Sequence, residues 1–257
     1  MCELFGLNSK KKMKMNEMLK EFFSHGVDHP HGWGMAFFYD NAVSLEKQPE
    51  PSYKSLYLKQ RLRSEIEVNK MMAHIRLATR GNTDYENSHP FVMRDNEKRT
   101  WTLAHNGTVF EGDTMKRFVH TQKGQTDSER ILCYIISRID KKQEEKKAPL
   151  TSCERFKNVD EIVCEISPEN KLNLLIYDGE LLYVHTNFRN SLHRLQKKEG
   201  ILVSTRPLTE EMWEEVPMNR LLAYKEGRLW KTGTNHGNEF IYSEEKMKLL
   251  FLDYAAL

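Results

Sequence analysis

Cys2, directly behind Met1, is the residue of this chain whose chemistry stands out first. Removal of Met1 would place a thiol and a free α-amine on one residue. An α-amine has an unperturbed pKa of about 7.7–8.0, so it can accept a proton from the thiol and return it later. The resulting thiolate is a strong nucleophile. An early cysteine also arises by chance, so Cys2 matters only if the chain supplies an oxyanion hole and a substrate anchor.

Asn106 and Gly107 are the candidates for the oxyanion hole. An asparagine side-chain amide and the backbone N–H that follows it can both donate to a developing oxyanion. Glycine allows that N–H to approach a ligand closely. The same dipeptide between two strand-like segments is also a common signal for a type I′ hairpin turn, so both interpretations stay open.

Arg76 and Asp127 are the candidates for the substrate anchor. Arg76 lies near the end of an apolar segment and is either a surface residue of an edge strand or a buried ligand for a carboxylate. Asp127 follows Thr126 in the sequence Thr126–Glu129, which is typical of a capping box with Thr126 as N-cap and Glu129 as its partner. That arrangement would leave the Asp127 carboxylate available for an ammonium group.

The spacing of apolar residues predicts the elements that position these groups. We expect strands at Glu3–Leu7, Lys70–Ala78 and Arg99–His105, the last closed by Asn106 and Gly107. Helical spacing predicts further elements over Met15–Phe23, from Thr126 through Ile139, and over Ser152–Ile166. The C-terminal part reads mostly as strands, and the charged segment Lys141–Pro149 as an exposed loop. Together these patterns indicate an α+β domain with many antiparallel strands.

Composition narrows the class of protein. The chain has 257 residues, 39% of them hydrophobic and 30% charged, with a formal net charge of +2 that gives no indication of nucleic-acid binding. No apolar segment approaches the roughly 18–20 residues that span a bilayer, and no signal peptide is evident. Four cysteines without metal-type spacing predict reduced thiols and a cytoplasmic location. Scattered histidines give no zinc pattern, so we expect no metal and no cofactor.

Four motifs give the chain its resemblance to a known family. They are Cys2 behind Met1, the octapeptide His74–Gly81, His105-Asn106-Gly107, and Thr126–Glu129. In this order they resemble the class II glutamine amidotransferases, which are N-terminal-nucleophile (Ntn) hydrolases. The similarity is strongest to the stand-alone YafJ-like subgroup, and three further segments extend it: His31–Gly34, Ser88–Phe91 and Ser204–Leu208.

The resemblance implies a four-layer αββα sandwich of two antiparallel sheets, formed by residues 1–257 as a single domain. It implies that Cys2 is the nucleophile and that Asn106 and Gly107 form the oxyanion hole. Arg76 would bind the α-carboxylate of the substrate and Asp127 its α-ammonium. Thr79 would line the glutamine pocket. Leu77 and Arg80 stand where some members have Trp and His, so we expect a different pocket wall.

The resemblance also implies a reaction. We expect cleavage of the γ-carboxamide of glutamine, or of a related γ-glutamyl amide, through a thioester on Cys2, releasing glutamate and ammonia or an amine. A single Ntn domain leaves no room for a synthase domain, so any ammonia acceptor would be a separate protein. The alternative is a catalytically silent glutamine-sensing or scaffold subunit. Neither nucleic acid nor a membrane is an expected partner.

Overall fold

The computed structural model describes residues 2–39, 42–79, 81–110 and 113–244. Two sheets dominate it, and every strand pair is antiparallel. The seven-stranded sheet has the order β11 (Glu214–Glu215), β9 (His193–Gln196), β10 (Gly200–Ser204), β1 (Glu3–Lys14), β4 (Glu67–Ile75), β2 (Trp33–Tyr39) and β3 (Ala42–Gln48). The six-stranded sheet has the order β13 (Arg228–Thr232), β12 (Leu222–Lys225), β8 (Leu182–His185), β7 (Lys171–Tyr177), β6 (Thr100–Thr108) and β5 (Phe91–Arg94).

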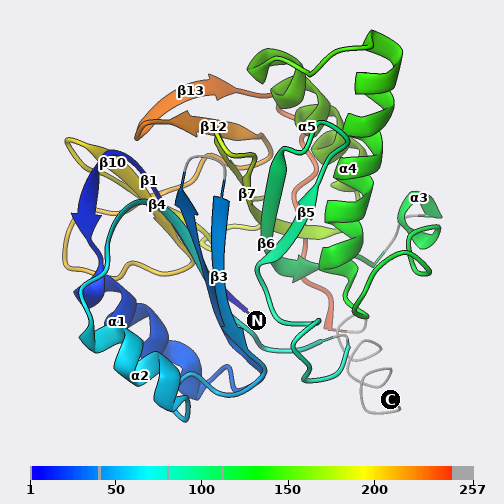
Figure 1. Ribbon diagram of the computed structural model, residues 1–257. Coiled ribbons are helices and arrows are strands. Elements are labelled where there is room, and N and C mark those ends of the chain that lie inside the picture. The colour runs from blue at the N-terminus through cyan, green and yellow to red at the C-terminus, as the bar shows by residue number, and fades with distance from the viewer. Residues whose placement is uncertain (1, 40–41, 80, 111–112, 245–257) are drawn as a thin grey trace.

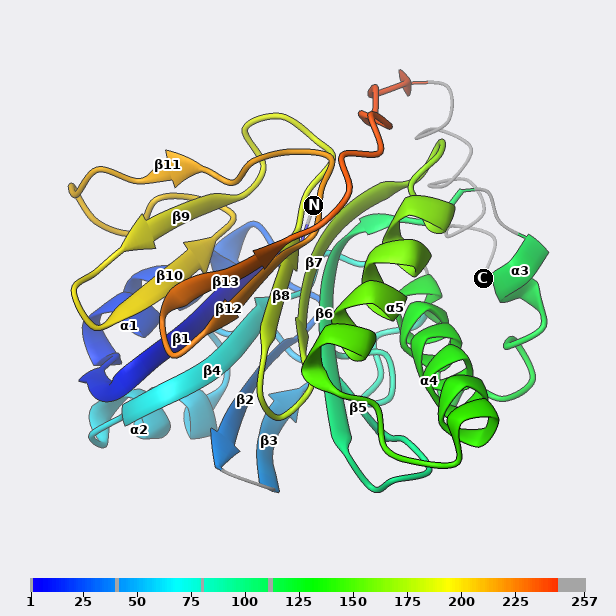
Figure 2. The same ribbon diagram turned by 90° about the horizontal axis from the view of Figure 1, so that it is seen from above.

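Two pairs of helices cover the outer faces of the sheets (Figures 1 and 2). Helices α1 (Asn16–Ser24) and α2 (Leu56–Arg63) pack on the seven-stranded sheet, and α4 (Asp127–Lys146) and α5 (Ser152–Ile166) pack on the six-stranded sheet. A 3-10 turn (His25–Val27) and the short helix α3 (Asp113–Lys116) complete the set. The expected four-layer αββα sandwich is therefore confirmed.

Three apolar cores hold the layers together. The middle core lies between the sheets, where Leu4, Ala36 and Met72 of one sheet meet Ala104 and Leu175 of the other. The outer faces of the same strands pack against the helices, so β2 and β7 are apolar on both faces. Full burial of one such side chain contributes roughly 1.5–3 kcal/mol. The strand ends that carry Cys2 and Asn106 therefore extend from a rigid base.

The ends of helix α4 differ from the sequence prediction. Thr126 caps the helix by accepting from the Glu129 N–H at 3.2 Å. The Glu129 carboxylate, however, accepts from the N–H groups of Lys123 and Gly124, so the capping box that we expected here is incomplete. The helix continues to Lys146, and most of the loop predicted over Lys141–Pro149 is helical. Ion pairs along the helix surface, such as Lys142–Glu145 at 3.4 Å, stabilise that charged turn.

No helix within the described ranges combines the length and the apolar character that crossing a membrane requires.

Candidate active site

Cys2 directly precedes β1, a central strand that pairs with β10 on one side and β4 on the other. The Leu77 N–H donates to Cys2 Sγ at 3.3 Å, and the thiol contacts the Leu77 carbonyl oxygen at 3.3 Å. Burial raises the pKa of the Cys2 thiol, and the backbone hydrogen bond to Leu77 counteracts this only in part. The thiol therefore needs a nearby base to become a nucleophile.

The neighbouring Glu3 fixes the start of β1, a role that we did not predict from the sequence. Its buried carboxylate lies 2.7 Å from His25 Nδ1 and 2.7 Å from Arg206 Nε. The hydrogen bond to Glu3 raises the pKa of His25, which favours the charged imidazolium in this pair. Arg206 belongs to the segment Ser204–Leu208, so the one available sequence signal was the family resemblance of that segment.

The segment His31–Gly34 positions the residues that follow β4. Backbone hydrogen bonds join His31 to the Arg76 carbonyl oxygen at 3.0 Å and the Arg76 N–H to Gly32 at 2.8 Å. His31 Nδ1 accepts from the Ala78 N–H at 2.8 Å. Gly32 has φ +135°, which other residues rarely adopt, and Trp33 is fully buried. The segment thus forms a tight loop with a packed indole.

Asn106 and Gly107 lie inside strand β6, opposite Asn173 and Leu172 of β7. The hairpin interpretation, and the predicted end of the strand at His105, are therefore wrong. A Cβ atom on residue 107 would lie 1.9 Å from the Lys171 carbonyl oxygen, so only glycine fits between the strands. Asn106 is buried, and its Oδ1 has no hydrogen-bond partner among the described residues.

Four of the predicted site residues line one pocket: Cys2, Thr79, Asn106 and Gly107. The remaining lining residues are Leu77, Thr108, Phe110, Lys171, Phe240 and Tyr242. The cavity volume is about 20 Å³, which holds about one water molecule and not an amino acid. Arg80, where we expected a different pocket wall, lies outside the described residues.

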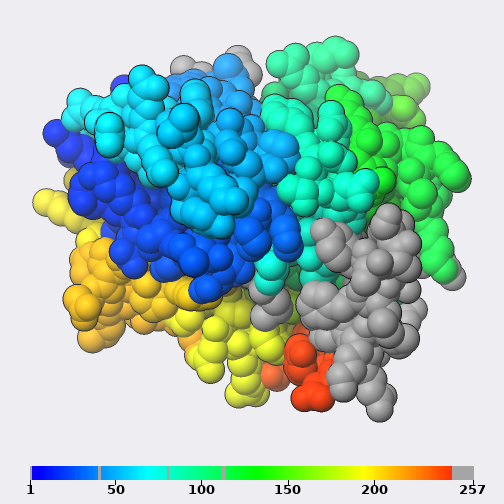
Figure 3. All heavy atoms as spheres, turned by 90° about the horizontal axis from the view of Figure 1, so that it is seen from below, coloured from blue at the N-terminus to red at the C-terminus, as the bar shows by residue number. Residues whose placement is uncertain are grey.

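The C-terminal segment supplies part of the pocket wall, which the sequence did not predict. Phe240 stacks on Phe110 with ring centroids 5.7 Å apart, and its N–H donates to the Asn187 carbonyl oxygen at 2.7 Å. Figure 3 shows the last described residues in red beside yellow residues of the preceding strands and turns. The segment therefore closes one side of the pocket.

Arg76 and Asp127 are both buried but do not line the pocket. The Arg76 guanidinium, 2% exposed, donates to the carbonyl oxygens of Gly81 and Asn82 at 2.9 and 2.8 Å. The surface interpretation of Arg76 is therefore wrong. Burial is the main cause of the raised pKa of the Cys2 thiol, while Arg76 lowers that pKa and Asp127 raises it. Both charges thus act on the thiol from outside the pocket.

The Asp127 side chain is engaged in hydrogen bonds rather than free. Its carboxylate accepts from the Val109 N–H at 2.7 Å and from the Ser128 N–H at 3.0 Å. Val109 follows β6 directly, so Asp127 ties the first turn of α4 to the strand that carries Asn106. Asp127 therefore has a structural function whatever it binds.

The buried histidines are structural in this arrangement. His74 and His89 stack with ring centroids 4.0 Å apart, and burial lowers the pKa of both well below the usual value. His105 lies within hydrogen-bond distance of Ser128 Oγ and of the Lys171 carbonyl oxygen. Within the described part of the chain, no group of three or more His, Cys, Asp or Glu residues is placed to hold a metal ion.

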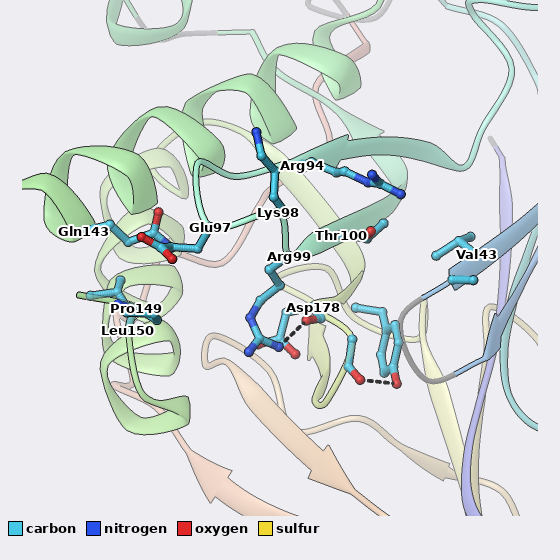
Figure 4. A pocket seen from close by; sticks show the side chains of 13 residues that line it. Val43, Arg94, Glu97, Lys98, Arg99, Thr100, Gln143, Pro149, Leu150 and Asp178 are labelled. Atoms are coloured by element: carbon cyan, nitrogen blue, oxygen red, sulfur yellow. Dashed lines mark hydrogen bonds between the residues drawn. The ribbon is translucent and has the colours of Figure 1, made fainter. Parts of the chain in front are cut away.

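A larger cavity of about 550 Å³ lies at the other end of β6 and β7, next to Thr100 and Tyr177. Its lining includes Arg94, Lys98 and Arg99, and Figure 4 shows the Arg99 guanidinium directed at the Asp178 backbone, where it donates to the carbonyl oxygen at 2.9 Å. None of the residues that the sequence singled out for chemistry lines this cavity. The pocket at Cys2 is therefore the candidate active site.

Comparison with known proteins bears on the family and the fold of the chain. An uncharacterized protein of Methanocaldococcus jannaschii is 30% identical over 96% of this chain and 72% of its own length. The putative glutamine amidotransferase YafJ of Escherichia coli is 28% identical over 80% of each chain. A solved structure, a predicted glutamine amidotransferase from Pseudomonas aeruginosa, shares the fold with a TM-score of 0.59, covering 90% of this chain and all of that one at 19% identity.

The family match covers residues 1–200, under the description "Glutamine amidotransferases class-II". That span includes the pocket-lining residues from both sheets and every site residue that the sequence predicted. It ends before Phe240 and Tyr242, which complete the pocket wall. On this match and the shared fold, the chain belongs to the class II glutamine amidotransferases.

Proposed function

We propose that the protein is an amidohydrolase that cleaves the γ-carboxamide of glutamine or of a related γ-glutamyl amide. The observation that carries the proposal is the convergence of Cys2, Asn106 and Gly107 on one pocket. A thiol and an oxyanion hole are the two parts that acyl transfer from an amide requires. The family assignment supports glutamine-type substrates over amides in general.

The reaction would begin with removal of Met1, which lies outside the described residues. The α-amine of Cys2 takes the thiol proton, and the thiolate attacks the carboxamide carbon. Asn106 and Gly107 donate to the resulting oxyanion. The C–N bond then breaks, the amine returns the proton to the leaving nitrogen, and a glutamyl thioester remains. Water attacks the thioester and releases glutamate with the thiol restored.

We propose that Arg76 and Asp127 hold the amino-acid head of the substrate, the first through its α-carboxylate and the second through its α-ammonium. Both charges are within electrostatic reach of the Cys2 thiol. Because neither lines the closed pocket, the loop at Gly81 and Asn82 would have to rearrange with the C-terminal segment when substrate binds.

The test is release of glutamate from glutamine and from a panel of γ-glutamyl amides. We expect turnover that Cys2→Ala abolishes and that Cys153→Ser leaves unchanged, because Cys153 is exposed on α5 and does not line the pocket. Turnover that persists in the Cys2→Ala protein would move the nucleophile elsewhere and end the proposal.

One observation favours a second candidate, a glutamine-sensing subunit without catalysis. Burial raises the pKa of the Cys2 thiol, which disfavours the thiolate that catalysis needs but leaves binding unaffected. A sensor would bind glutamine without releasing glutamate and would keep its affinity in the Cys2→Ala protein. Calorimetric titration alongside the turnover assay separates the two functions.

A further inference from the structure

Two buried amide groups near Cys2 have complementary hydrogen-bonding atoms that are not used. Asn106 and Asn173 are both buried, the second completely. Among the described residues, Asn106 Oδ1, which is an acceptor, and Asn173 Nδ2, which is a donor, have no hydrogen-bond partner. Leaving one such group buried without a partner costs roughly 1–3 kcal/mol. An unpaired acceptor and an unpaired donor in one part of the interior therefore point to a function.

The six-stranded sheet places these two side chains next to each other. Asn106 of β6 is the direct partner of Asn173 of β7 in the antiparallel register. Side chains of directly opposite residues project from the same face, with Cβ atoms about 4.5–5.5 Å apart. The next pair on that face, Ala104 and Leu175, belongs to the core between the sheets. Both amides therefore face the layer between the sheets, where Asn106 lines the pocket.

The amide of Asn173 is held from the other side of its strand. Thr186, which directly follows β8, donates its hydroxyl hydrogen to Asn173 Oδ1 at 2.7 Å. Ser191 Oγ lies 3.2 Å from the same oxygen. Since β7 lies between β6 and β8, these contacts fix the oxygen on the β8 side. The NH₂ group of Asn173 is left for the β6 side, where Asn106 lies.

The orientation of the Asn106 amide decides whether this residue can stabilise an oxyanion. The amide has a donor at Nδ2 and an acceptor at Oδ1, and a half-turn of the group exchanges them. Only Nδ2 can donate to a developing oxyanion, whereas Oδ1 in its place would repel the negative charge. A donor that holds Oδ1 would therefore select the productive orientation.

We propose that Asn173 is a positioning residue of the oxyanion hole. Its Nδ2 donates to Asn106 Oδ1 as the oxyanion forms, which directs Asn106 Nδ2 at the substrate oxygen. Asn173 does not itself line the pocket, so it acts through Asn106. The chain of hydrogen bonds runs from Thr186 through Asn173 to Asn106 and crosses three neighbouring strands. This inference rests on the proposed function and adds a residue to its machinery.

The first test is kinetic. Asn173→Leu removes the donor, and Asn173→Asp keeps the shape but replaces the NH₂ group with an acceptor. We expect both to lower kcat roughly ten- to a hundredfold, less than or equal to the loss of the donor itself. KM should change little, because the oxyanion forms only after the substrate has bound. Thr186→Val, which frees the Asn173 amide to turn, should lower kcat by a smaller factor and tests the same chain without altering Asn173.

A double variant shows whether Asn173 acts through Asn106. Once Asn106→Ala has removed the oxyanion donor, Asn173→Leu has nothing left to orient and should cause no further loss of kcat. Losses that multiply in the double variant would overturn the inference, because Asn173 would then act independently of Asn106.

Thr102 provides a matched control. It is fully buried in β6 four residues before Asn106, and its hydroxyl likewise has no hydrogen-bond partner among the described residues. It does not line the pocket at Cys2. Thr102→Val should therefore leave kcat unchanged. Circular dichroism and thermal melts of every variant establish that the folded protein is compared.

Alkylation of Cys2 separates this inference from the proposed function, because it needs no turnover. Chloroacetone and chloroacetamide both form an S–CH₂ bond with the thiolate and lose chloride. The ketone carbonyl also accepts the thiolate readily, which places its oxygen in the oxyanion hole, whereas the amide carbonyl does so poorly. The ratio of the two rates therefore reports the hole. Mass spectrometry of the N-terminal tryptic peptide measures both rates at Cys2 alone.

We expect Asn173→Leu to lower the ratio of the chloroacetone rate to the chloroacetamide rate about tenfold, and Thr102→Val to leave it unchanged. No turnover of any γ-glutamyl amide, with a ratio that still depends on Asn173, would refute the proposed function and support the positioning function. Normal turnover with an unchanged kcat and an unchanged ratio in Asn173→Leu would overturn the inference and leave the proposed function intact.

Discussion

The Nε2 atoms of His185 and His236 lie 3.0 Å apart and share a single proton. His185 Nδ1 must carry a hydrogen, because its partner at 2.8 Å is the Leu172 carbonyl oxygen. His236 Nδ1 must lack one, because it accepts from the Asn238 N–H at 3.0 Å. The hydrogen between the rings therefore belongs to His236, which donates to His185. This bond ties the C-terminal segment to strand β8 and requires both rings to be neutral.

The first prediction follows from this pair. Burial, together with the neighbouring His236, lowers the pKa of His185 to about 3. Between pH 3 and the ordinary value of 6.5 the unfolded chain binds more protons than the folded chain, so stability rises with pH across this window and falls on acidification. The slope is at most about 1.4 kcal/mol per pH unit for one histidine.

Urea denaturation at pH 7 and pH 5 measures the effect. His185→Gln should show an acid loss about 2 kcal/mol smaller than the wild type, since glutamine does not titrate. The buried His74 and His89 contribute equally to both proteins, so the difference reports the His185–His236 pair. An identical acid loss in the two proteins would mean that His185 is already charged in the fold.

The second prediction concerns Asn106. Loss of one oxyanion donor typically lowers kcat by about 10²–10³, so Asn106→Ala should reduce glutamate release by that factor. Its Oδ1 has no hydrogen-bond partner among the described residues, so the change should alter the melting temperature little. Parallel kinetics and thermal melts test the claim. A large loss of stability with unchanged kcat in the surviving protein would make Asn106 structural.

The third prediction separates the two functions of Asp127. Asp127→Ala leaves the buried Val109 N–H without an acceptor, which should cost about 1–3 kcal/mol of stability. Asp127→Asn keeps an oxygen acceptor but removes the charge, so it should preserve most of the stability. Truncating one partner of a buried charge pair costs about 2–5 kcal/mol, which predicts a fall in kcat/KM of roughly thirty-fold to a few thousand-fold in both variants.

Substrates with one charge blocked provide the control for Asp127. The Asp127→Asn protein should be nearly indifferent to N-acetylation of glutamine, because the same partner cannot be lost twice. Wild-type enzyme that cleaved N-acetylglutamine as well as glutamine would show that Asp127 holds no ammonium.

The fourth prediction concerns an ion pair far from the pocket. Arg155 Nε of α5 lies 2.6 Å from the Asp178 carboxylate in the turn after β7, and both side chains are almost fully buried. Removing one partner of a buried pair typically costs about 3–5 kcal/mol. Arg155→Met should therefore lower stability by about that amount in urea melts. At temperatures where the variant stays folded, kcat should match the wild type, because the pair lies at the opposite end of β7 from Lys171.

The fold was predictable where local signals are strong. Helix α5 begins and ends where the sequence predicts, because Thr151 and Glu154 form a complete capping box and apolar residues recur at helical spacing. Asn106 and Gly107 led to the wrong prediction of a hairpin turn. Glycine is required at position 107 because the carbonyl group of Lys171, which is distant in the sequence, approaches closely there. The charged residues 141–146 were misread because ion pairs stabilise a helix that polarity alone does not indicate.

The candidate site was predictable only in part. Family motifs grouped Cys2, Thr79, Asn106 and Gly107, which the structure places around one pocket. The motifs gave no indication that Arg76 and Asp127 lie outside the closed pocket, because the partners of both are backbone groups without a sequence signature. Lys171 and Phe240 could not be found, since each reaches the pocket through contacts between distant parts of the chain.

The pocket wall joins residue 2 to residues 240 and 242, and this has a consequence for how the protein is made. The ribosome synthesises the thiol near the start of translation and Phe240 only after both sheets have been completed. During most of synthesis, Cys2 therefore has neither its β10 neighbour nor its aromatic cover. Oxidants and electrophiles in the cell would meet the nascent thiol before the C-terminal segment encloses it, so chemical damage at Cys2 should depend on how fast the chain is finished.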